Sequence, residues 1–323
     1  MVTTTISTRA RTVMKRAALA AYTSSVAIAL GAGPSMASAA SHTPRAHGHA
    51  LTQPIRRATT ITVAPSRIAG SLGVLENIPQ TLNNCGPASM AEVLAYWGIQ
   101  RTQDETAAVL RADGNPFGMS PYAIPSYARG LGLEALVAPE GTPRLVKALI
   151  SNGFPVIVSQ RVSLEDHYQH YRPIEAYDDR QGVFISSDPY MGPGYSIPYA
   201  AFSQIWTTSN GRFVALYPPA KASLLKAVLL SAGWNAGQAF ARDIAVTEHR
   251  MRHPEQNNSA WGNSAALHWS GARSYPYLTL AWDNLQLRRL STARANLQQA
   301  ARHGASSLTI SWIRGEFPVR YTG

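Results

Sequence analysis

The hydrophobic pattern of the chain changes from a helical to a strand-like spacing near its middle. Apolar residues recur at helical spacing over Gly86–Trp97, and Gly98 follows as a stop signal. Thr102-Gln103-Asp104-Glu105 fits a capping box and predicts the start of a second helix. Two further helices are expected over Pro121–Arg129 and Thr142–Ser151.

Short apolar runs bounded by Gly, Asp and Pro come next and are typical of strands. They cover Phe154–Val162, His170–Tyr177, Val183–Ser187 and Arg212–Tyr217. Helices that precede an antiparallel sheet predict an α+β fold rather than a parallel, doubly wound one. We therefore expect an α+β domain over residues 68–219, which Pro218-Pro219 closes.

The last hundred residues or so have a third kind of pattern. Stretches rich in Ala, Leu, Gln and Arg carry large aromatic residues on one side and are separated by turn residues, which predicts stacked antiparallel helices. These stretches are Ser259–Ser270, Tyr277–Leu290 and Ser291–His303. We expect an all-α domain over residues 220–323, and since no fixed-period repeat is visible, a solenoid stays an open possibility.

The first 39 residues have the three parts of a secretory signal. Four basic residues precede a weakly apolar run over residues 17–32, and Ala37-Ser38-Ala39 supplies the small residues expected before a cleavage site. A membrane anchor is the alternative, but the apolar run is shorter than the ~20 residues that a span requires. We expect a signal peptide over residues 1–39, a flexible linker over residues 40–67 and a secreted protein without a stable transmembrane segment.

The net charge of +11 does not indicate a nucleic-acid-binding protein. Residues 1–67 hold eight basic residues and no acidic one, residues 68–220 have a net charge of −4, and residues 221–323 have +7. The excess therefore lies in the export segment and in a basic C-terminal third, which favours an anionic surface. No motif for reading bases is present, so we expect no nucleic-acid partner.

The chain has one cysteine, Cys85, so a disulfide within the chain is excluded. Cys85 stands at the start of a predicted helix, where the partial positive charge of the N-terminus favours a thiolate. The carboxamide of Gln80 can donate a hydrogen bond to an oxyanion, with the backbone N–H of Cys85 as second donor. Gly86 would let a substrate carbonyl approach the backbone. A small buried cysteine is the plainer reading, but the decapeptide Gln80–Ser89 favours catalysis.

A thiol nucleophile needs a base, and His167 and His170 are the only histidines between residues 50 and 248. His170 opens a predicted strand that would hold its ring rigidly, whereas His167 lies in an acidic loop and is the less favoured base. Asp188 would accept a hydrogen bond from His170 Nδ1–H, which leaves Nε2 to face the sulfur. Asp188-Pro189 by itself reads as a turn, but its place after an apolar strand favours the carboxylate role.

These residues resemble the papain-like double-glycine (bacteriocin-processing) cysteine peptidases, the family numbered thirty-nine in the cysteine class, in its stand-alone peptidase-like branch. The resemblance covers roughly Ile68–Pro219. It rests on Gln80–Trp97, on His170-Tyr171 leading to Ala176-Tyr177-Asp178-Asp179, and on Asp188-Pro189-Tyr190. It implies a papain-like cysteine peptidase fold. It also implies the site residues Gln80, Cys85, His170 and Asp188 as oxyanion donor, nucleophile, base and orienter.

Two further features bear on this resemblance. The helical texture of Trp261–Gly304 resembles tetratricopeptide repeats, which implies a concave surface for a peptide or a partner protein. The strand after His170 departs from the family, in which many members have an apolar run followed by Gly. This chain has Arg172, Pro173, Glu175 and Ala176 there. Pro173 lacks an N–H donor, so we expect the strand to be an edge or bulged. We expect Arg172 either to depress the pKa of His170 or to bind a substrate carboxylate.

Thiol-dependent hydrolysis of a peptide or other amide bond is the function that these residues predict best. A transglutaminase-type acyl transferase or a cell-wall amidase would use the same residues. An inert surface module that binds a partner through its C-terminal helices is the alternative of a different class. No Gly-x-x-x-x-Gly-Lys-Ser/Thr loop is present, so export driven by an ATPase within this chain is excluded. We expect no cofactor, because no metal cluster is visible and His47-Gly48-His49 do not make a closed site.

Overall fold

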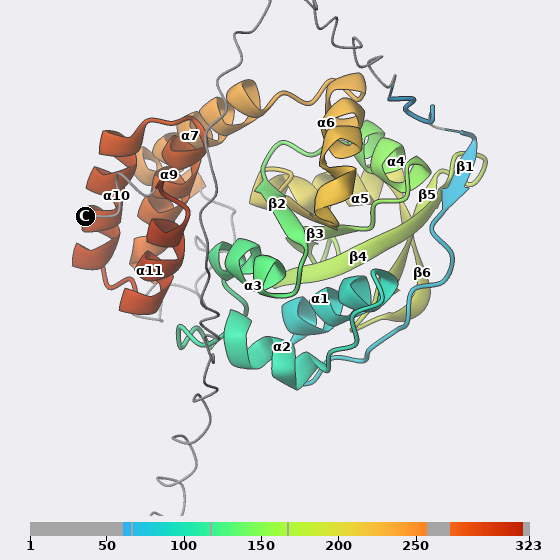
Figure 1. The fold of residues 1–323 in the computed structure, drawn as a ribbon, viewed down its shortest axis with the longest axis horizontal. Helices are drawn as coiled ribbons and strands as arrows, with labels where there is room; N and C mark the ends of the chain where they lie inside the picture. Colours follow the sequence, from blue (N-terminus) through green and yellow to red (C-terminus); the bar gives the residue numbers. More distant parts are fainter. Residues whose placement is uncertain (1–60, 66, 117, 167, 257–271, 319–323) are drawn as a thin grey trace, which may run out of the picture. The chain divides into compact units, whose positions relative to one another are not determined.

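The described part of the chain is an antiparallel sheet with helices before, between and after its strands (Figure 1). The computed structural model describes residues 61–65, 67–116, 118–166, 168–256 and 272–318. The predicted signal peptide, most of the linker and the stretch Ser259–Ser270 lie outside these residues. All described elements belong to one compact unit that begins at Ala58. The domain boundary expected at residue 219 therefore stays a prediction.

The strands of the described residues form one sheet in the order β2-β7-β3-β4-β5-β6, and β1 also pairs with β4. Every pairing is antiparallel. The strands are β1 (Ala69–Ser71), β2 (Glu134–Ala138), β3 (Val156–Arg161), β4 (Gln169–Asp178), β5 (Val183–Asp188), β6 (Gly192–Pro198) and β7 (Phe213–Tyr217). The four predicted strands are confirmed as β3, β4, β5 and β7.

The four predicted N-terminal helices are also confirmed. The capping box at Thr102 is present, because Thr102 Oγ1 accepts from the Glu105 N–H while the Glu105 carboxylate accepts from the Thr102 N–H. The Pro121–Arg129 helix begins as a short 3-10 helix, η1 (Pro121–Ala123). The helices of the described residues are α1 (Cys85–Tyr96), α2 (Gln103–Leu110), α3 (Ile124–Gly130), α4 (Pro143–Ser151), α5 (Tyr199–Trp206), α6 (Ala222–Ser231), α7 (Ala236–Arg252), α9 (Tyr275–Gln286), α10 (Leu290–Arg302) and α11 (Ser307–Gly315).

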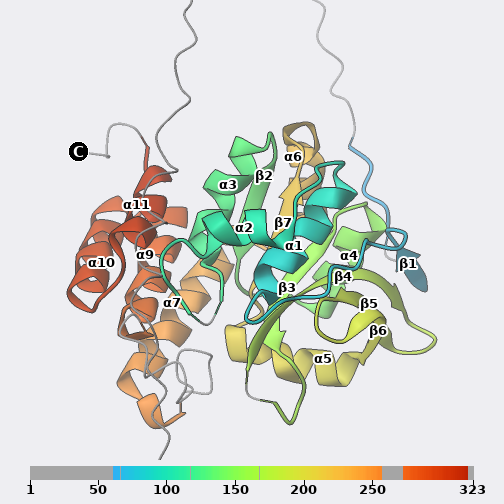
Figure 2. The same cartoon turned by 90° about the horizontal axis from the view of Figure 1, so that it is seen from below.

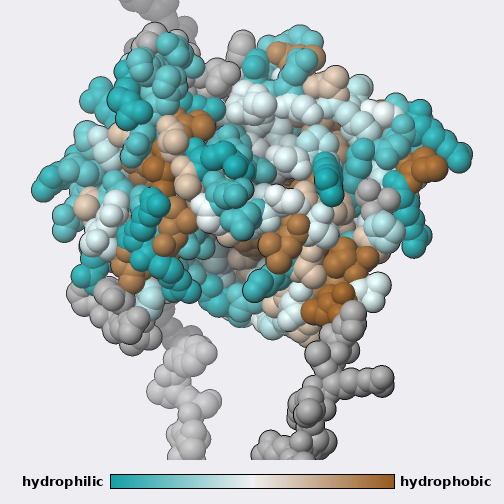
Figure 3. All heavy atoms as spheres, turned by 90° about the horizontal axis from the view of Figure 1, so that it is seen from above, coloured by the Kyte–Doolittle hydropathy of each residue, from teal (hydrophilic) through white to brown (hydrophobic). Residues whose placement is uncertain are grey.

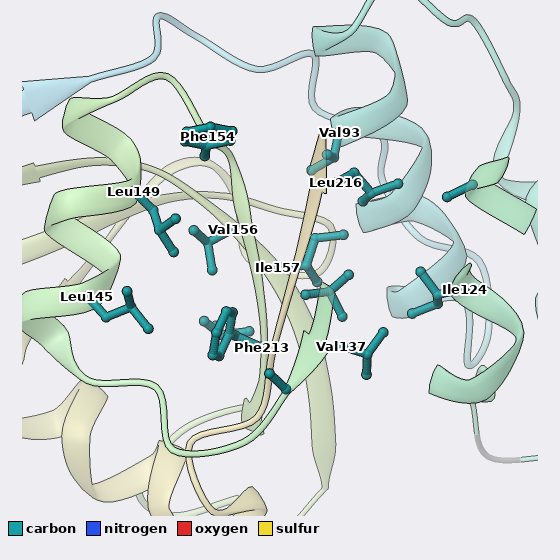
Figure 4. Close-up of a cluster of buried hydrophobic side chains, with 14 of the residues drawn as sticks. Val93, Ile124, Val137, Leu145, Leu149, Phe154, Val156, Ile157, Phe213 and Leu216 are labelled. Atoms are coloured by element: carbon teal, nitrogen blue, oxygen red, sulfur yellow. The ribbon is translucent and has the colours of Figure 1, made fainter. Parts of the chain in front are cut away.

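The core lies on both faces of the central strands, which explains why these strands read as nearly continuous apolar runs. Figure 4 shows Leu145 and Leu149 of α4 on one side of the strands and Val93 of α1 on the other. Val156 and Ile157 of β3 are both fully buried, although successive side chains of a strand point to opposite faces. The central strands are therefore covered by helices on both sides, and α1 is fixed against them.

The strands that the sequence pattern missed lie mainly at the ends of the sheet. β2 and β6 each pair along one edge only, and most of their residues are partly exposed. An outer strand needs less apolar alternation, and the Gly and Pro residues of β6 read as a turn. Helices α5, α6, α7 and α11 were missed as well. No helix was predicted over these four segments, although α7 has 17 residues.

The prediction that Pro173 lies in an edge strand or beside a bulge is confirmed in its second form. β4 is not an edge strand, because β3 pairs with it through Pro173 and β5 pairs with it on the other side. The pairing with β5 shifts register between Ile174 and Ala176, so the predicted bulge is confirmed at this place. β4 therefore bends just after the segment that carries His170.

The C-terminal helices α7, α9, α10 and α11 lie together beside the sheet (Figures 1 and 2). Trp282 of α9 donates from Nε1 to the Val137 carbonyl of β2 at 3.2 Å, and the Arg212 guanidinium pairs with Asp243 of α7 at 2.7 Å. The stretches expected at Tyr277–Leu290 and Ser291–His303 are confirmed as α9 and α10. The tetratricopeptide-like character and the concave partner surface stay predictions.

The surface and the helix lengths add two observations. On the face that Figure 3 displays, hydrophobic residues gather in separate patches with hydrophilic residues between them. Within the described ranges, no helix is long and apolar enough to cross a membrane.

Candidate active site

Cys85 is the first residue of α1, as predicted. Asn83, two residues before Cys85, has a φ of 60°. Asn adopts this left-handed conformation more readily than most residues, and here it turns the chain into the helix. Burial by itself would raise the pKa of the Cys85 thiol. A hydrogen bond and charge from His170, with further hydrogen bonds from the backbone at Tyr171 and Gly86, hold that pKa below its ordinary value. The sulfur is thus placed to be a thiolate.

Gly86 has a packing role that the sequence analysis did not foresee. A Cβ built at Gly86 would lie 2.5 Å from Cγ of Met119, which is itself buried. The side of Gly86 that a side chain would occupy is therefore filled by Met119. A glycine at this position lets α1 pack closely against Met119. This packing role is independent of any effect that Gly86 has on a substrate.

His170 lies at the start of β4 and is buried between Cys85 and Asp188. Its Nε2 is 3.0 Å from Asp188 Oδ1, and the ring interacts with the Cys85 thiol, which raises the pKa of His170. Burial lowers the pKa of His170, but the Asp188 hydrogen bond and the Cys85 thiol outweigh it and raise that pKa above its ordinary value. Imidazolium and thiolate therefore stabilise each other.

The predicted orientation of the His170 ring is wrong. We expected Nδ1 to face Asp188, but Nε2 does, which leaves Nδ1 as the nitrogen for Cys85. The strand pattern does not show which ring nitrogen meets which partner, because that depends on where the Asp188 carboxylate and the Cys85 thiol lie relative to the ring.

Asp188 ends β5 and is fully buried. Oδ1 accepts from His170 and also from the backbone N–H groups of Tyr190 and Met191, at 2.8 and 2.9 Å. Burial would raise the pKa of this carboxyl, but the His170 hydrogen bond and charge, with the charge of Arg172, lower it to about 2. Asp188 thus opens a turn and also accepts a hydrogen bond from His170, and its role in catalysis stays a prediction.

Arg172 is fully buried against Asp188, so the expected contact with a substrate carboxylate is not what its position favours. The pKa of His170 is raised overall by Asp188 and Cys85, and the effect of Arg172 on it stays a prediction. Arg172 Nε lies 3.0 Å from Asp188 Oδ2, and Nη2 donates to the Val162 carbonyl at 2.7 Å. Arg172 therefore balances the charge of Asp188 from the side opposite to His170.

Gln80 lies in the segment that runs past the Asp188 turn into α1. Its backbone N–H donates to the Pro189 carbonyl at 2.9 Å, which ties Gln80 to the residue after Asp188. Its side-chain Oε1 is buried and has no hydrogen-bond partner in the described part of the chain. His170 and Asp188 are thus joined by a direct hydrogen bond, Cys85 and His170 each shift the pKa of the other, and Gln80 is tied to the Asp188 turn through its backbone.

Buried polar residues that the sequence analysis missed hold this entering segment, residues 72–80. Glu92 of α1 is fully buried, and its Oε1 accepts from the Ile78 N–H at 2.9 Å. Asn77 donates to Ser187 Oγ at 3.2 Å and to the Asp188 carbonyl at 3.1 Å. Glu175 Oε2 accepts from the Leu75 N–H at 2.8 Å. A sequence signal for Glu92 exists, because it is an acidic residue among the apolar positions of α1, two turns after Cys85.

Two histidine predictions lie outside the described residues, namely His167 as an alternative base and the weak His47-Gly48-His49 metal site. Among the residues that the structure describes, no group of three or more His, Cys, Asp or Glu side chains could hold a metal ion.

Residues 74–213 match the model of the Peptidase_C39 like family. This matched segment contains all four site residues predicted above. This match and the order of helices and antiparallel strands confirm the predicted resemblance and the papain-like α+β class over that segment. No curated protein matches the chain.

Solved structures cover nearly half of the chain. One is a double glycine motif protease from an AMS/PCAT transporter in complex with the leader peptide (22% identity, 46% of this chain, 94% of that chain, TM-score 0.36). The others are a C39-like peptidase from Bacillus anthracis (16%, 46%, 97%, 0.38) and the peptidase domain of Streptococcus ComA, a bifunctional ABC transporter of a quorum-sensing pathway (23%, 44%, 96%, 0.33).

The buried Glu92 generates a prediction for stability. Burial raises the pKa of this carboxyl to about 8, so the folded protein holds its proton to a higher pH than the unfolded chain, where the pKa is about 4.3. Raising the pH between these values therefore favours unfolding, by up to about 1.4 kcal/mol per pH unit. Glu92→Gln keeps an acceptor for Ile78 and removes this titration. Its unfolding free energy relative to the wild type should rise by about 2–3 kcal/mol from pH 5.5 to pH 8.

Urea unfolding at three pH values measures this difference. Glu76→Gln is the matched control, because Glu76 is exposed in the same neighbourhood of the chain, and its difference from the wild type should stay constant. A Glu92→Gln difference that does not change with pH would mean that Glu92 is ionised in the folded protein.

Proposed function

We propose that residues 68–219 form a cysteine peptidase that hydrolyses a peptide or other amide bond. The proposal is carried by one observation: Cys85, His170 and Asp188 lie together as buried side chains, with His170 Nε2 3.0 Å from Asp188 Oδ1 and His170 holding the pKa of the Cys85 thiol below its ordinary value. Burial limits the competition of water for these interactions. The match of this segment to a family of peptidases supports the same reading.

In the first step, the Cys85 thiolate attacks the carbonyl carbon of the scissile bond. The carbonyl oxygen becomes an oxyanion, for which the Gln80 carboxamide and the Cys85 backbone N–H are the proposed donors. The imidazolium of His170 then passes the proton on Nδ1 to the leaving nitrogen, and an acyl-enzyme and a free amine result. Asp188 holds the Nε2–H throughout and stabilises the positive charge of the ring.

In the second step, neutral His170 removes a proton from water at Nδ1. The resulting hydroxide equivalent attacks the thioester carbon, the carboxylic acid is released, and the sulfur leaves as the thiolate. Arg172 contributes indirectly, because its charge keeps Asp188 ionised while His170 gains and loses its proton.

We further propose that the protein is exported after removal of residues 1–39. The basic residues, apolar run and small residues of that segment support this proposal. N-terminal sequencing of the protein from the culture medium of producing cells should give a chain that starts at or near residue 40. Recovery of the full-length chain from the membrane fraction would favour an uncleaved anchor instead.

A prediction for Gln80 tests the hydrolytic mechanism. Gln80→Ala should lower kcat by about 10²–10³-fold with little change in KM, because the donor acts on the oxyanion and not on the ground state. Gln100→Ala is the matched control, since Gln100 is exposed, and it should retain full activity. The best substrate of a fluorogenic peptide library serves for the measurement, with Cys85→Ala as the inactive reference.

The alternatives lead to other results in this assay. A transglutaminase-type transferase would incorporate an added amine into the acyl product instead of releasing the acid. A catalytically inert module would give no turnover of any peptide, and Cys85→Ala would then behave as the wild type.

A further inference from the structure

A cavity of about 110 Å³ lies where the C-terminal helices meet the sheet. One side is lined by the sheet and its connections, including Tyr171 of β4 and Arg212 before β7. The other side is lined by Arg250 of α7 and by Tyr275 and Thr279 of α9. The residues from α7 and α9 lie outside the segment that matches the peptidase family, so this cavity depends on the C-terminal third of the chain.

The cavity carries an excess of positive charge. Arg212 pairs with Asp243 through Nη2 at 2.7 Å, but its Nη1 is buried and has no hydrogen-bond partner within the described ranges. Arg250 also lines the cavity, and burial together with the charge of Arg212 lowers its pKa. The neighbouring Asp283 does not offset this charge, because its burial raises the pKa of that carboxyl well above the ordinary value. The guanidinium groups of Arg212 and Arg250 therefore face one carboxylate, that of Asp243.

Neutral hydroxyl groups complete the lining. Tyr122 and Thr279 share a hydrogen bond at 3.1 Å across the boundary between η1 and α9. Burial raises the pKa of Tyr171 to about 12, so this phenol keeps its proton at neutral pH and can donate. Hydroxyl and guanidinium donors around a small, partly open cavity are the groups that bind an oxyanion.

We propose that this cavity is a binding site for a carboxylate group. The net charge of its lining is close to +1, which a carboxylate neutralises, whereas a phosphate dianion would leave an uncompensated buried charge. A planar carboxylate also fits the two parallel donors of a guanidinium. The carboxylate comes either from a small organic acid or from the C-terminus or an acidic side chain of a peptide.

The site lies close to the catalytic residues without being part of them. Gln169 and Tyr171 line the cavity, and His170 stands between them on β4. The backbone of Tyr171 also helps to lower the pKa of the Cys85 thiol. Binding at the cavity goes beyond the proposed function, because it requires neither Cys85 nor hydrolysis.

Thermal unfolding of the full chain in sodium acetate tests the site, with sodium chloride and sodium phosphate at matched ionic strength and pH as references. Specific binding raises the midpoint temperature along a saturating curve, whereas the general stabilisation by excluded salts grows without saturation. We expect a saturating rise in acetate for the wild type, at least a tenfold weaker apparent affinity in Arg250→Gln, and a smaller rise in phosphate.

Two further variants keep the test sharp. Arg302→Gln is the matched control, because Arg302 is exposed on α10, and it should bind acetate as the wild type does. Tyr171→Phe removes one hydroxyl donor, should weaken acetate binding, and serves if Arg250→Gln does not fold. A rise that is linear in all proteins, or equal in wild type and Arg250→Gln, overturns the proposal. A larger saturating rise in phosphate overturns the assignment to carboxylate.

The source of the carboxylate is found with pairs of short peptides that end in a free or an amidated C-terminus, using protein alkylated at Cys85. Tighter binding of the free form by tenfold or more, lost in Arg250→Gln, assigns the site to peptides. Saturable acetate binding with no difference between the two peptides assigns it to small acids.

Discussion

The Asp188 carboxylate is the group on which the rest of the site depends. It is fully buried, yet every charge and donor around it is arranged to keep it ionised: His170 at Oδ1, Arg172 at Oδ2 and two backbone N–H groups of the following turn. A buried carboxylate without these partners would take up a proton. Because one carboxylate orients His170, balances Arg172 and shapes the turn that meets Gln80, its placement sets the geometry of the whole site.

Helix α1 and the segment before it are held by a second kind of constraint, which is the pairing of buried acidic side chains with backbone N–H groups. Glu92 and Glu175 accept from Ile78 and Leu75, and Asn77 reaches the end of β5. The same helix carries Cys85 at its N-terminus and packs against the sheet that carries His170. The nucleophile, its base and the proposed oxyanion donor are thus fixed to one rigid frame rather than to separate loops.

The sequence predicted the parts of this account that depend on local patterns. The Thr102 capping box, the start of α1 at Cys85 and the apolar strands are decided by neighbouring residues, and each is confirmed. The orientation of the His170 ring, the pairing of Arg172 with Asp188 and the role of Glu92 are decided by residues far away in the sequence, so no local pattern distinguishes them. The outer strands β2 and β6 were missed because partly exposed edges need little apolar alternation.

The most direct test of the central claim is the pH dependence of Cys85 alkylation by iodoacetamide in the wild type, His170→Ala and the exposed control His249→Ala. The account predicts half-maximal reactivity of the wild type and the control well below pH ~8.5, the ordinary value for a thiol. In His170→Ala, burial remains while the hydrogen bond and charge are gone, so the midpoint should move above that value. Equal midpoints in all three proteins, or an ordinary midpoint in the wild type, would contradict the thiolate–imidazolium pair.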